Sequence, residues 1–298
     1  MHMNIDLRQL RHFVAVAEEL HFGRAAARLH MTQPPLSQSI QSLEAALQCE
    51  LFLRTRRSVQ LTSAGQALLP EAQRLLQQAA ALPALVQRAA HGESGKLTLA
   101  FVSTADYSVL PSFLREFRKA YPQVHIELRE ATTDIQLEEL SQGRIDVGLL
   151  IPPLPERLKD EIDYVPVVTE PLVAVLPQNA ARRKGPLHLR SLNELPLIIF
   201  PREIAPALHD AILGCFRDAG LTPHIGQEAI QMQTIVGLVS AGMGMALVPQ
   251  SVSNLQRPGV EYRSLRDKVP LVETGLAWRR DNASPVLRAF LEHLRKIP

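Results

Sequence analysis

The first fifty residues carry the apolar spacing of three short helices. Along residues 6–20 an apolar side chain recurs every three or four positions, which predicts an amphipathic helix. Residues 25–29 are mostly alanine and predict a second, shorter helix. Pro34 and Pro35 begin a third helix, because a proline in the first turn loses no hydrogen bond. Two short helices joined by a tight turn, the second with a polar outer face, are typical of a helix-turn-helix.

The third helix is the candidate for reading DNA. In a helix-turn-helix the second helix of the motif enters the major groove, where its N-terminal side chains meet the base edges. A glutamine amide suits this task because it both donates to and accepts from adenine. The pattern leaves open a small helical bundle with a solvated polar face. The candidate DNA-binding residues of this segment are Thr32, Gln33, Pro34, Pro35, Ser37, Gln38 and Gln41.

Residues 51–62 predict a two-stranded hairpin with arginines at its tip. Such a wing lays guanidinium groups against phosphates or into the minor groove. The charge distribution agrees with this interpretation: residues 1–62 carry seven arginines against five acidic residues, although the net charge of the chain is only +2. The hairpin adds three candidate DNA-binding residues, Arg54, Arg56 and Arg57.

A long helix rich in alanine, leucine and glutamine is predicted from Ala64 to Ala90. Its apolar residues follow a near-heptad spacing, and an exposed stripe of this kind needs a partner, of which an identical helix is the simplest. Pro70 is expected in the first turn, and Pro83 is expected to kink or split the helix. A dimer formed in this way places two reading helices against a palindromic DNA site.

Strand and helix patterns alternate from Lys96 onward, which predicts an α/β domain with a largely parallel sheet. Two strand patterns follow one another at residues 164–176, where the chain is expected to cross into a second lobe. Residues 271–278 and a helix over residues 284–297 are expected to return to the first lobe. Two α/β lobes of this kind have a cleft at the C-terminal ends of their strands.

Hydroxyl side chains follow two of the predicted strands of the first lobe. Hydroxyls and free N–H groups at a strand-to-helix junction suit a carboxylate, which the N-terminus of a helix also favours. Serine and threonine are also common helix caps, and Arg202 is equally consistent with an ordinary surface charge. The candidate effector-binding residues are Ser103, Thr104, Thr132, Thr133, Phe200, Pro201, Arg202 and Met232.

Several function classes find no support in the chain. A nucleophile elbow, a dinucleotide-binding loop and a phosphate-binding lysine loop are all missing, which disfavours an enzyme. Cys49 and Cys215 lie far apart, and the histidines show no metal-ligand spacing, so neither a metal nor a cofactor is expected. No signal peptide precedes the first helix, and no apolar run reaches the ~18 residues of a membrane span. A cytoplasmic protein without a membrane segment is expected.

The N-terminal third resembles the winged helix-turn-helix of LysR-type transcriptional regulators. The resemblance rests on residues 10–18 (LRHFVAVAE), 32–37 (TQPPLS), 51–54 (LFLR) and 61–65 (LTSAG). It implies a winged helix-turn-helix, a long linker helix and an α/β effector domain of two lobes like a periplasmic binding protein. The expected limits are 1–62 for the DNA-binding domain, 63–91 for the linker helix and 92–298 for the effector domain, with lobe I at about 95–167 and 270–298 and lobe II at about 168–269.

The same resemblance implies partners and a ligand. It predicts a transcriptional activator that binds double-stranded DNA at a pseudo-palindromic operator, dimerises through the linker helix, forms a homotetramer and contacts RNA polymerase. The chain is similar to the branch that includes regulators of aromatic degradation, whose hydroxyls at the positions of Thr104 and Thr133 hold inducer carboxylates. Ile151 stands where close relatives carry an arginine, so an uncharged or singly charged aromatic ligand is as consistent as a dicarboxylate. A small-molecule binding or transport module is the alternative class.

Overall fold

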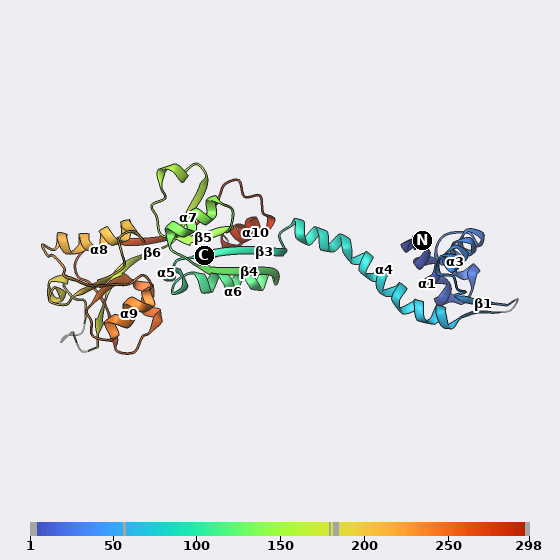
Figure 1. Cartoon of the computed structure of the whole chain (residues 1–298), viewed down its shortest axis with the longest axis horizontal. Coiled ribbons are helices and arrows are strands. Elements are labelled where there is room, and N and C mark those ends of the chain that lie inside the picture. The colour runs from blue at the N-terminus through green and yellow to red at the C-terminus, as the bar shows by residue number, and fades with distance from the viewer. Residues whose placement is uncertain (1–4, 56–57, 179, 181–184, 296–298) are drawn as a thin grey trace. The chain divides into compact units, whose positions relative to one another are not determined.

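The computed structural model describes residues 5–55, 58–178, 180 and 185–295. Contacts within the chain divide it into two compact units, one ending at Gln87 and the other beginning at Arg88 (Figure 1). Within the described residues, no helix has both the length and the apolar character needed to cross a membrane.

The first unit contains the three predicted helices and the predicted hairpin. Asp6 begins the first helix with a capping box, in which its side chain accepts a hydrogen bond from a backbone N–H and Gln9 bonds back. Prolines occupy the first turn of the third helix, as predicted. The elements are α1 (Leu7–Glu19), α2 (Phe22–Arg28), α3 (Gln33–Leu47), β1 (Phe52–Arg54), β2 (Val59–Leu61) and α4 (Ser63–Ala90).

The core of the first unit joins the hairpin to the helices. The Phe52 ring of β1 lies 5.5 Å from the Phe13 ring and 5.9 Å from the Phe22 ring, centroid to centroid. Leu36 and Ile40 of α3 are fully buried against the same cluster. Because the buried side of α3 faces this core, its opposite side is left to solvent.

Helix α4 differs from the sequence prediction at both prolines. It runs without interruption from Ser63 to Ala90 (Figure 1), so Pro83 does not split it. Pro70 is in the third turn and not in the first, because the helix already begins at Ser63. Each proline lacks the N–H that would bond to the carbonyl four residues earlier, and this costs the helix a hydrogen bond.

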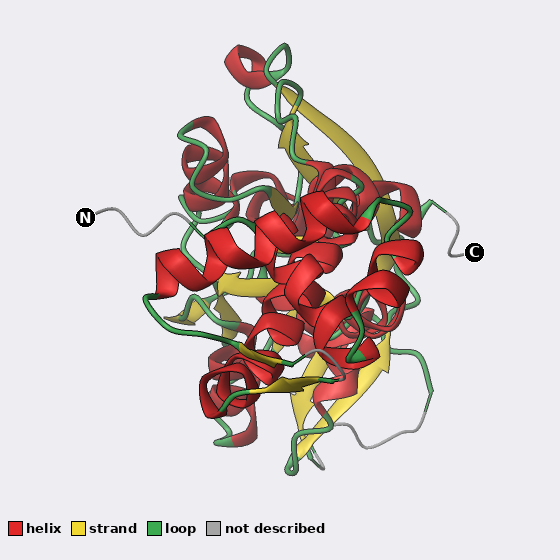
Figure 2. Ribbon diagram, turned by 90° about the vertical axis from the view of Figure 1, so that its right-hand side faces the viewer, coloured by secondary structure: helices red, strands yellow, loops and turns green. Residues whose placement is uncertain are grey.

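Strands and helices alternate along most of the second unit. Figure 2 colours the helices of the chain red and its strands yellow. Its elements are β3 (Ser94–Phe101), α5 (Ser103–Asp106), α6 (Leu110–Ala120), β4 (Gln123–Glu130), α7 (Thr133–Ser141), β5 (Val147–Leu150), η1 (Glu156–Leu158), β6 (Ile162–Pro177), η2 (Leu189–Leu192), β7 (Leu197–Ile199), α8 (Pro206–Asp218), β8 (Ile225–Glu228), α9 (Met232–Ser240), β9 (Ala246–Pro249), η3 (Gln250–Leu255), β10 (Val260–Ser264), β11 (Leu271–Arg279) and α10 (Pro285–Leu294).

The strands of the second unit form two lobes that share β6. In the first lobe β3 pairs in parallel with β4 and β5, and β11 pairs antiparallel with β5 and with the first part of β6. The later part of β6 pairs antiparallel with β9 and β10 of the second lobe. The sequence predicts two successive strands here, whereas the structure has one continuous strand of 16 residues. The chain crosses into the second lobe within β6, and it returns to the first lobe between β10 and β11.

Candidate functional sites

One side of α3 offers polar groups to solvent. Leu36, Ile40 and Leu43 are fully buried on the opposite side of the helix. Thr32 is the N-cap residue and makes no capping hydrogen bond with its side chain. Ser37 is half-buried. The exposed residues predicted to bind DNA in this segment are Thr32, Gln33, Pro34, Pro35, Gln38 and Gln41.

A hydrogen bond between α1 and α3 fixes the orientation of this surface. His12 Nδ1 lies 2.8 Å from the Ser39 hydroxyl. Burial lowers the pKa of His12, and the neighbouring Arg8 and Arg11 lower it further. The neutral imidazole is therefore favoured at the contact that holds α3 against α1.

The hairpin is anchored to α3 by one carboxylate. Glu44 accepts hydrogen bonds from the backbone N–H groups of Leu51 (2.9 Å) and Phe52 (3.3 Å). It also accepts one from Arg54 Nη2 at 2.6 Å, and the Arg54 guanidinium lies 5.0 Å from the centre of the Phe22 ring. Arg54 thus fastens the wing to the core in addition to any contact with DNA. The other two predicted wing residues, Arg56 and Arg57, lie outside the described residues.

A small cavity of about 50 Å³ lies in the second unit where strands of both lobes end. The chain leaves β3 and β4 here and enters α5 and α7, while the other wall comes from the start of α8 and α9. We call this cavity the inner pocket. Its lining includes six of the eight residues predicted for effector binding: Ser103, Thr104, Thr132, Thr133, Phe200 and Met232.

Pro201 and Arg202, the other two predicted residues, are not part of this lining. Arg202 instead donates hydrogen bonds from Nε and Nη2 to the two carboxylate oxygens of Asp210, at 2.8 and 2.7 Å. These bonds lower the pKa of Asp210 to about 2. The guanidinium is therefore paired along the surface of α8.

Two threonine hydroxyls of the inner pocket have no partner within the described part of the chain. Thr104 is 3% exposed, and its Oγ1 is buried without a hydrogen bond. Thr132 Oγ1 is in the same state. Thr133 differs, since its Oγ1 accepts from the Ile151 N–H at 3.2 Å and donates to the Ile151 carbonyl at 3.5 Å. Of the three threonines that line the pocket, two therefore have buried hydroxyls without a partner within the described residues, and the hydroxyl of the third is used internally.

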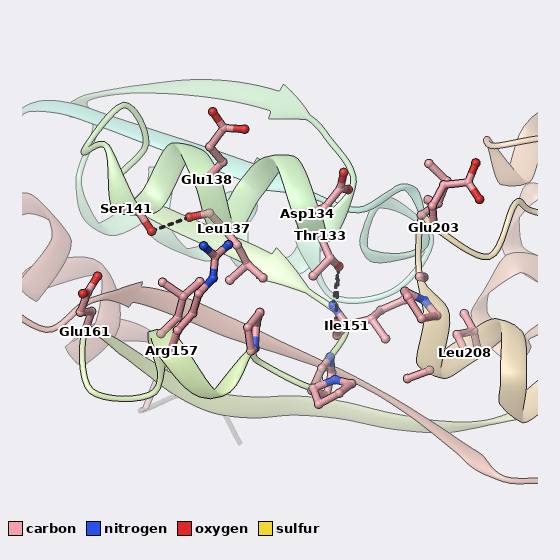
Figure 3. Close-up of a pocket in the computed structure, with 18 of the residues that line it drawn as sticks. Thr133, Asp134, Leu137, Glu138, Ser141, Ile151, Arg157, Glu161, Glu203 and Leu208 are labelled. Carbon is pink, nitrogen blue, oxygen red and sulfur yellow. Dashed lines mark hydrogen bonds between the residues drawn. The ribbon is translucent and has the colours of Figure 1, made fainter.

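A larger cavity of about 880 Å³ adjoins the inner pocket, and sequence reasoning missed it (Figure 3). We call it the outer chamber. Its walls are α7, the proline-rich turn at residues 152–155, η1 and the start of α8. The two cavities share lining residues, so they are contiguous: Thr133, Ile151, Ile204, Ala205 and Leu208. The signal that could have indicated this chamber is the Pro-Pro-Leu-Pro run directly after the buried strand β5.

The charges around the two cavities are mostly negative. Glu130 is the charged residue in the lining of the inner pocket. Arg157 extends toward the end of α7 that carries Ser141 (Figure 3). The carboxylates that line the outer chamber are Asp134, Glu138, Glu161 and Glu203. No cluster of histidine, cysteine, aspartate or glutamate suited to a metal ion occurs among the residues that the structure describes.

Comparisons with known proteins agree with both halves of this architecture. Residues 7–66 match the bacterial regulatory helix-turn-helix protein family of lysR type, and residues 90–297 match the LysR substrate binding domain. The regulator IlvR of Caulobacter vibrioides is 52% identical over 287 residues, covering 96% of each chain. AlsR of Bacillus subtilis is 42% identical over 289 residues, covering 96% of this chain and 94% of its own.

One of the similar solved structures contains DNA. Full-length CbnR, in a crystal structure with its target DNA, matches with a TM-score of 0.83 and 31% identity, covering 98% of this chain and 99% of that chain. The family consists of transcriptional regulators and not of enzymes. With a matching helix-turn-helix, a matching effector domain and relatives aligned over nearly their full length, the chain belongs to the LysR family of DNA-binding transcriptional regulators.

Proposed function

We propose that this regulator responds to a small organic acid, aromatic or otherwise, bound in the inner pocket between the lobes of its effector domain. The observation that carries the proposal is the Thr104 hydroxyl, which is buried and has no partner within the described residues. Leaving a buried hydroxyl unpaired costs free energy, so a native structure usually provides a partner or has a use for the group. A carboxylate oxygen placed between Thr104 and Thr132 would supply that partner.

Helix termini support the same ligand chemistry. The first residues of α7 and α9, Thr133 and Met232, both line the inner pocket. The N-terminus of a helix carries unpaired N–H groups and a partial positive charge, which favour an anion. Aromatic acids, expected from the resemblance to regulators of aromatic degradation, are one class that has this group.

For the DNA-binding domain, we propose that the exposed side of α3 reads base edges in the major groove and that the hairpin contacts the backbone. Gln33 and Gln38 are placed near the start of α3, where a recognition helix meets the bases. Two copies of α3 on one operator require a dimer. The exposed apolar side chains that support a dimer through α4 are Leu75, Leu82, Leu85 and Val86.

We propose that effector binding changes the angle between the two DNA-binding domains of a dimer. Dimers pair into a tetramer through the effector domains, and an effector that closes the cleft alters the DNA bend and the contact with RNA polymerase. Only a difference in the effector's affinity for the two states can drive this change. We propose that residues 1–62 form the DNA-binding domain, residues 63–91 the linker helix and residues 92–298 the effector domain.

A footprint on the DNA directly upstream of the coding sequence tests the proposal. The purified protein is applied with and without a panel of carboxylic acids, including benzoate. We expect a long protected region that shortens or shifts with at least one acid. Protection should weaken steeply with salt, because phosphate contacts release counterions. Protection that no acid alters would contradict the effector site, and no protection at low salt would contradict DNA binding at this position.

Gln33→Ala provides the test of base reading. We expect this variant to bind DNA with relaxed sequence preference, because the amide contacts base edges and not phosphates. Gln60→Ala, at an exposed position on β2, is the matched control and should retain sequence preference. Unchanged selectivity of the Gln33 variant would place the reading surface elsewhere.

A further inference from the structure

The sizes of the two contiguous cavities limit which part of a ligand enters each. The inner pocket, at about 50 Å³, has room for roughly three to five water molecules at ~10–15 Å³ each. A carboxylate has three heavy atoms and fits this space, whereas the remainder of a ligand has to extend elsewhere. The outer chamber, at about 880 Å³, adjoins it through Ile151, Ile204 and Leu208. A ligand that binds here therefore places its carboxylate end in the inner pocket and its apolar part along Ile151, Ile204 and Leu208.

The charges at the junction are unfavourable for a simple monoanion. Glu130 lines the inner pocket and forms no salt bridge within the described part of the chain. Asp134 and Glu203 line the outer chamber, and in Figure 3 their carboxylates point away from Thr133 and Ile151. Among the described residues, the inner lining contains neither lysine nor arginine. A carboxylate bound here would share the lining with the Glu130 carboxylate and would have no cationic side chain of the described residues beside it.

A ligand with a positive charge beside its carboxylate resolves this conflict. Thr104 is 3% exposed, and its hydroxyl has no partner within the described residues, so it favours an oxygen acceptor on the ligand. The N-termini of α7 and α9 favour a negative charge on that oxygen. Glu130 is exposed and forms no salt bridge within the described part of the chain, so its carboxylate favours a positive group on a ligand in the same lining. The two demands meet in one small head group.

We infer that the effector is a zwitterion, an α-amino acid with an apolar side chain. Its carboxylate bonds to the hydroxyls of Thr104 and Thr132, its ammonium group faces Glu130, and its side chain lies against Ile151 and Leu208. This inference rests on the proposed effector site and narrows the class of acid that the site accepts.

Matched ligand pairs test the inference on the full-length protein. Calorimetric titration compares L-alanine, L-valine, L-leucine and L-phenylalanine with propanoate, 3-methylbutanoate, 4-methylpentanoate and 3-phenylpropanoate, which lack only the amino group. At least one amino acid should bind about tenfold or more tightly than its partner, since a charge-assisted hydrogen bond is lost without the ammonium group. Equal or tighter binding of the amine-free acids, or binding of no member of the panel, would overturn the inference.

The Glu130→Gln variant assigns the ammonium contact. It should weaken amino acid binding about tenfold and leave binding of the amine-free acid unchanged or stronger. Glu292→Gln, on an exposed part of α10 outside both cavities, is the matched control and should bind like the unmodified protein. If Glu130→Gln keeps the full preference for amino acids, the inference fails.

The proposed function has separate readouts. Salt-dependent protection of DNA tests the regulator independently of any ligand. Thr104→Val should abolish binding of both members of a ligand pair, because both use the carboxylate site. A Thr104 variant that still binds both members normally would reject the inner pocket itself. A variant that binds neither member, together with no preference for the amine in the unmodified protein, would reject the zwitterion alone.

Discussion

Replacing Thr104 with valine keeps the shape of the side chain and removes a single hydroxyl. That hydroxyl is buried from solvent and has no hydrogen-bond partner within the described residues. An unpaired buried hydroxyl costs about 1–3 kcal/mol. We therefore expect Thr104→Val to raise the free energy of unfolding of the effector domain by about 1 kcal/mol or more in the absence of ligand.

A change of about 1 kcal/mol corresponds to a rise in Tm of about 2–4 °C for a unit of ~150–250 residues. Differential scanning calorimetry of the full chain resolves the transition of the unit that begins at Arg88. The same variant should lose the response to effector, because the group that stabilises bound ligand is the one that destabilises the empty pocket.

Thr133→Val is the matched control, made one residue after Thr132 in the same pocket. Its hydroxyl accepts a hydrogen bond from the Ile151 N–H, so valine leaves that N–H without its partner. We expect a loss of about 1–3 kcal/mol, opposite in sign to the effect at Thr104. The reasoning is refuted if Thr104→Val lowers the free energy of unfolding, or if both variants shift it in the same direction.

Three further predictions concern the first unit. Glu44→Ala should lower the free energy of unfolding of the first unit by about 2–3 kcal/mol, because three hydrogen bonds to the Glu44 carboxylate are lost. Urea unfolding measures the change, and an unchanged unfolding midpoint would contradict the prediction. The lowered pKa of His12 means that the folded state binds a proton less readily than the unfolded state. The free energy of unfolding should therefore fall as the pH drops below about 6.5. If a His12→Gln variant showed the same pH dependence as the unmodified protein, His12 would not be its source. Leu82→Glu on α4 should shift the protein toward smaller species in analytical ultracentrifugation, since Leu82 is 57% exposed and apolar; an unchanged sedimentation profile would place the dimer contact elsewhere.

Local sequence signals were sufficient for the DNA-binding domain. Proline at the start of α3, alternating residues in the hairpin and regular apolar spacing in α1 act within a few residues of one another. They failed at Pro70, which lies inside α4 and not in its first turn. They also could not show the packing at Gly65, where an added Cβ would lie 2.3 Å from the Leu51 carbonyl oxygen, so the first turn of α4 packs directly against the residue before the hairpin. Such tertiary contact is invisible to periodicity.

The long strand β6 shows the same limit in a sheet. The apolar pattern suggests two strands, the second of which begins at Pro171, yet Pro166 and Pro171 both lie within one strand. Pro166 pairs with Gly275 where the register of β11 shifts. An added Cβ at Gly275 would lie 2.4 Å from the Tyr164 ring, so a glycine there gives the aromatic side chain its space. A bulge of this kind tolerates proline, which the pattern of one strand alone does not reveal.

The sequence predicts the first-lobe side of the inner pocket and only part of the second-lobe side. Thr104 and Thr132 follow strands of a parallel sheet, whose C-terminal ends meet at one edge. Arg202 was expected at the ligand, but Asp210, eight residues further along the chain, pairs with it. Ile204 and Leu208 line the pocket through the placement of α8 in the second lobe, and that placement depends on contacts distant in sequence.

The continuity of β6 restricts how the two lobes can move. Because one strand is hydrogen-bonded in both lobes, a rotation of one lobe has to be taken up as twist along a ribbon of paired backbone and cannot be confined to a loose joint. Torsion of that kind stores elastic energy in proportion to the square of the angle, so small rotations are inexpensive and large ones are resisted. The register shift between Thr274 and Gly275 interrupts the ladder, and a bulge of this kind bends a strand and increases its local twist. Effector binding should therefore produce a small, graded rotation of one lobe that reverses when the ligand leaves.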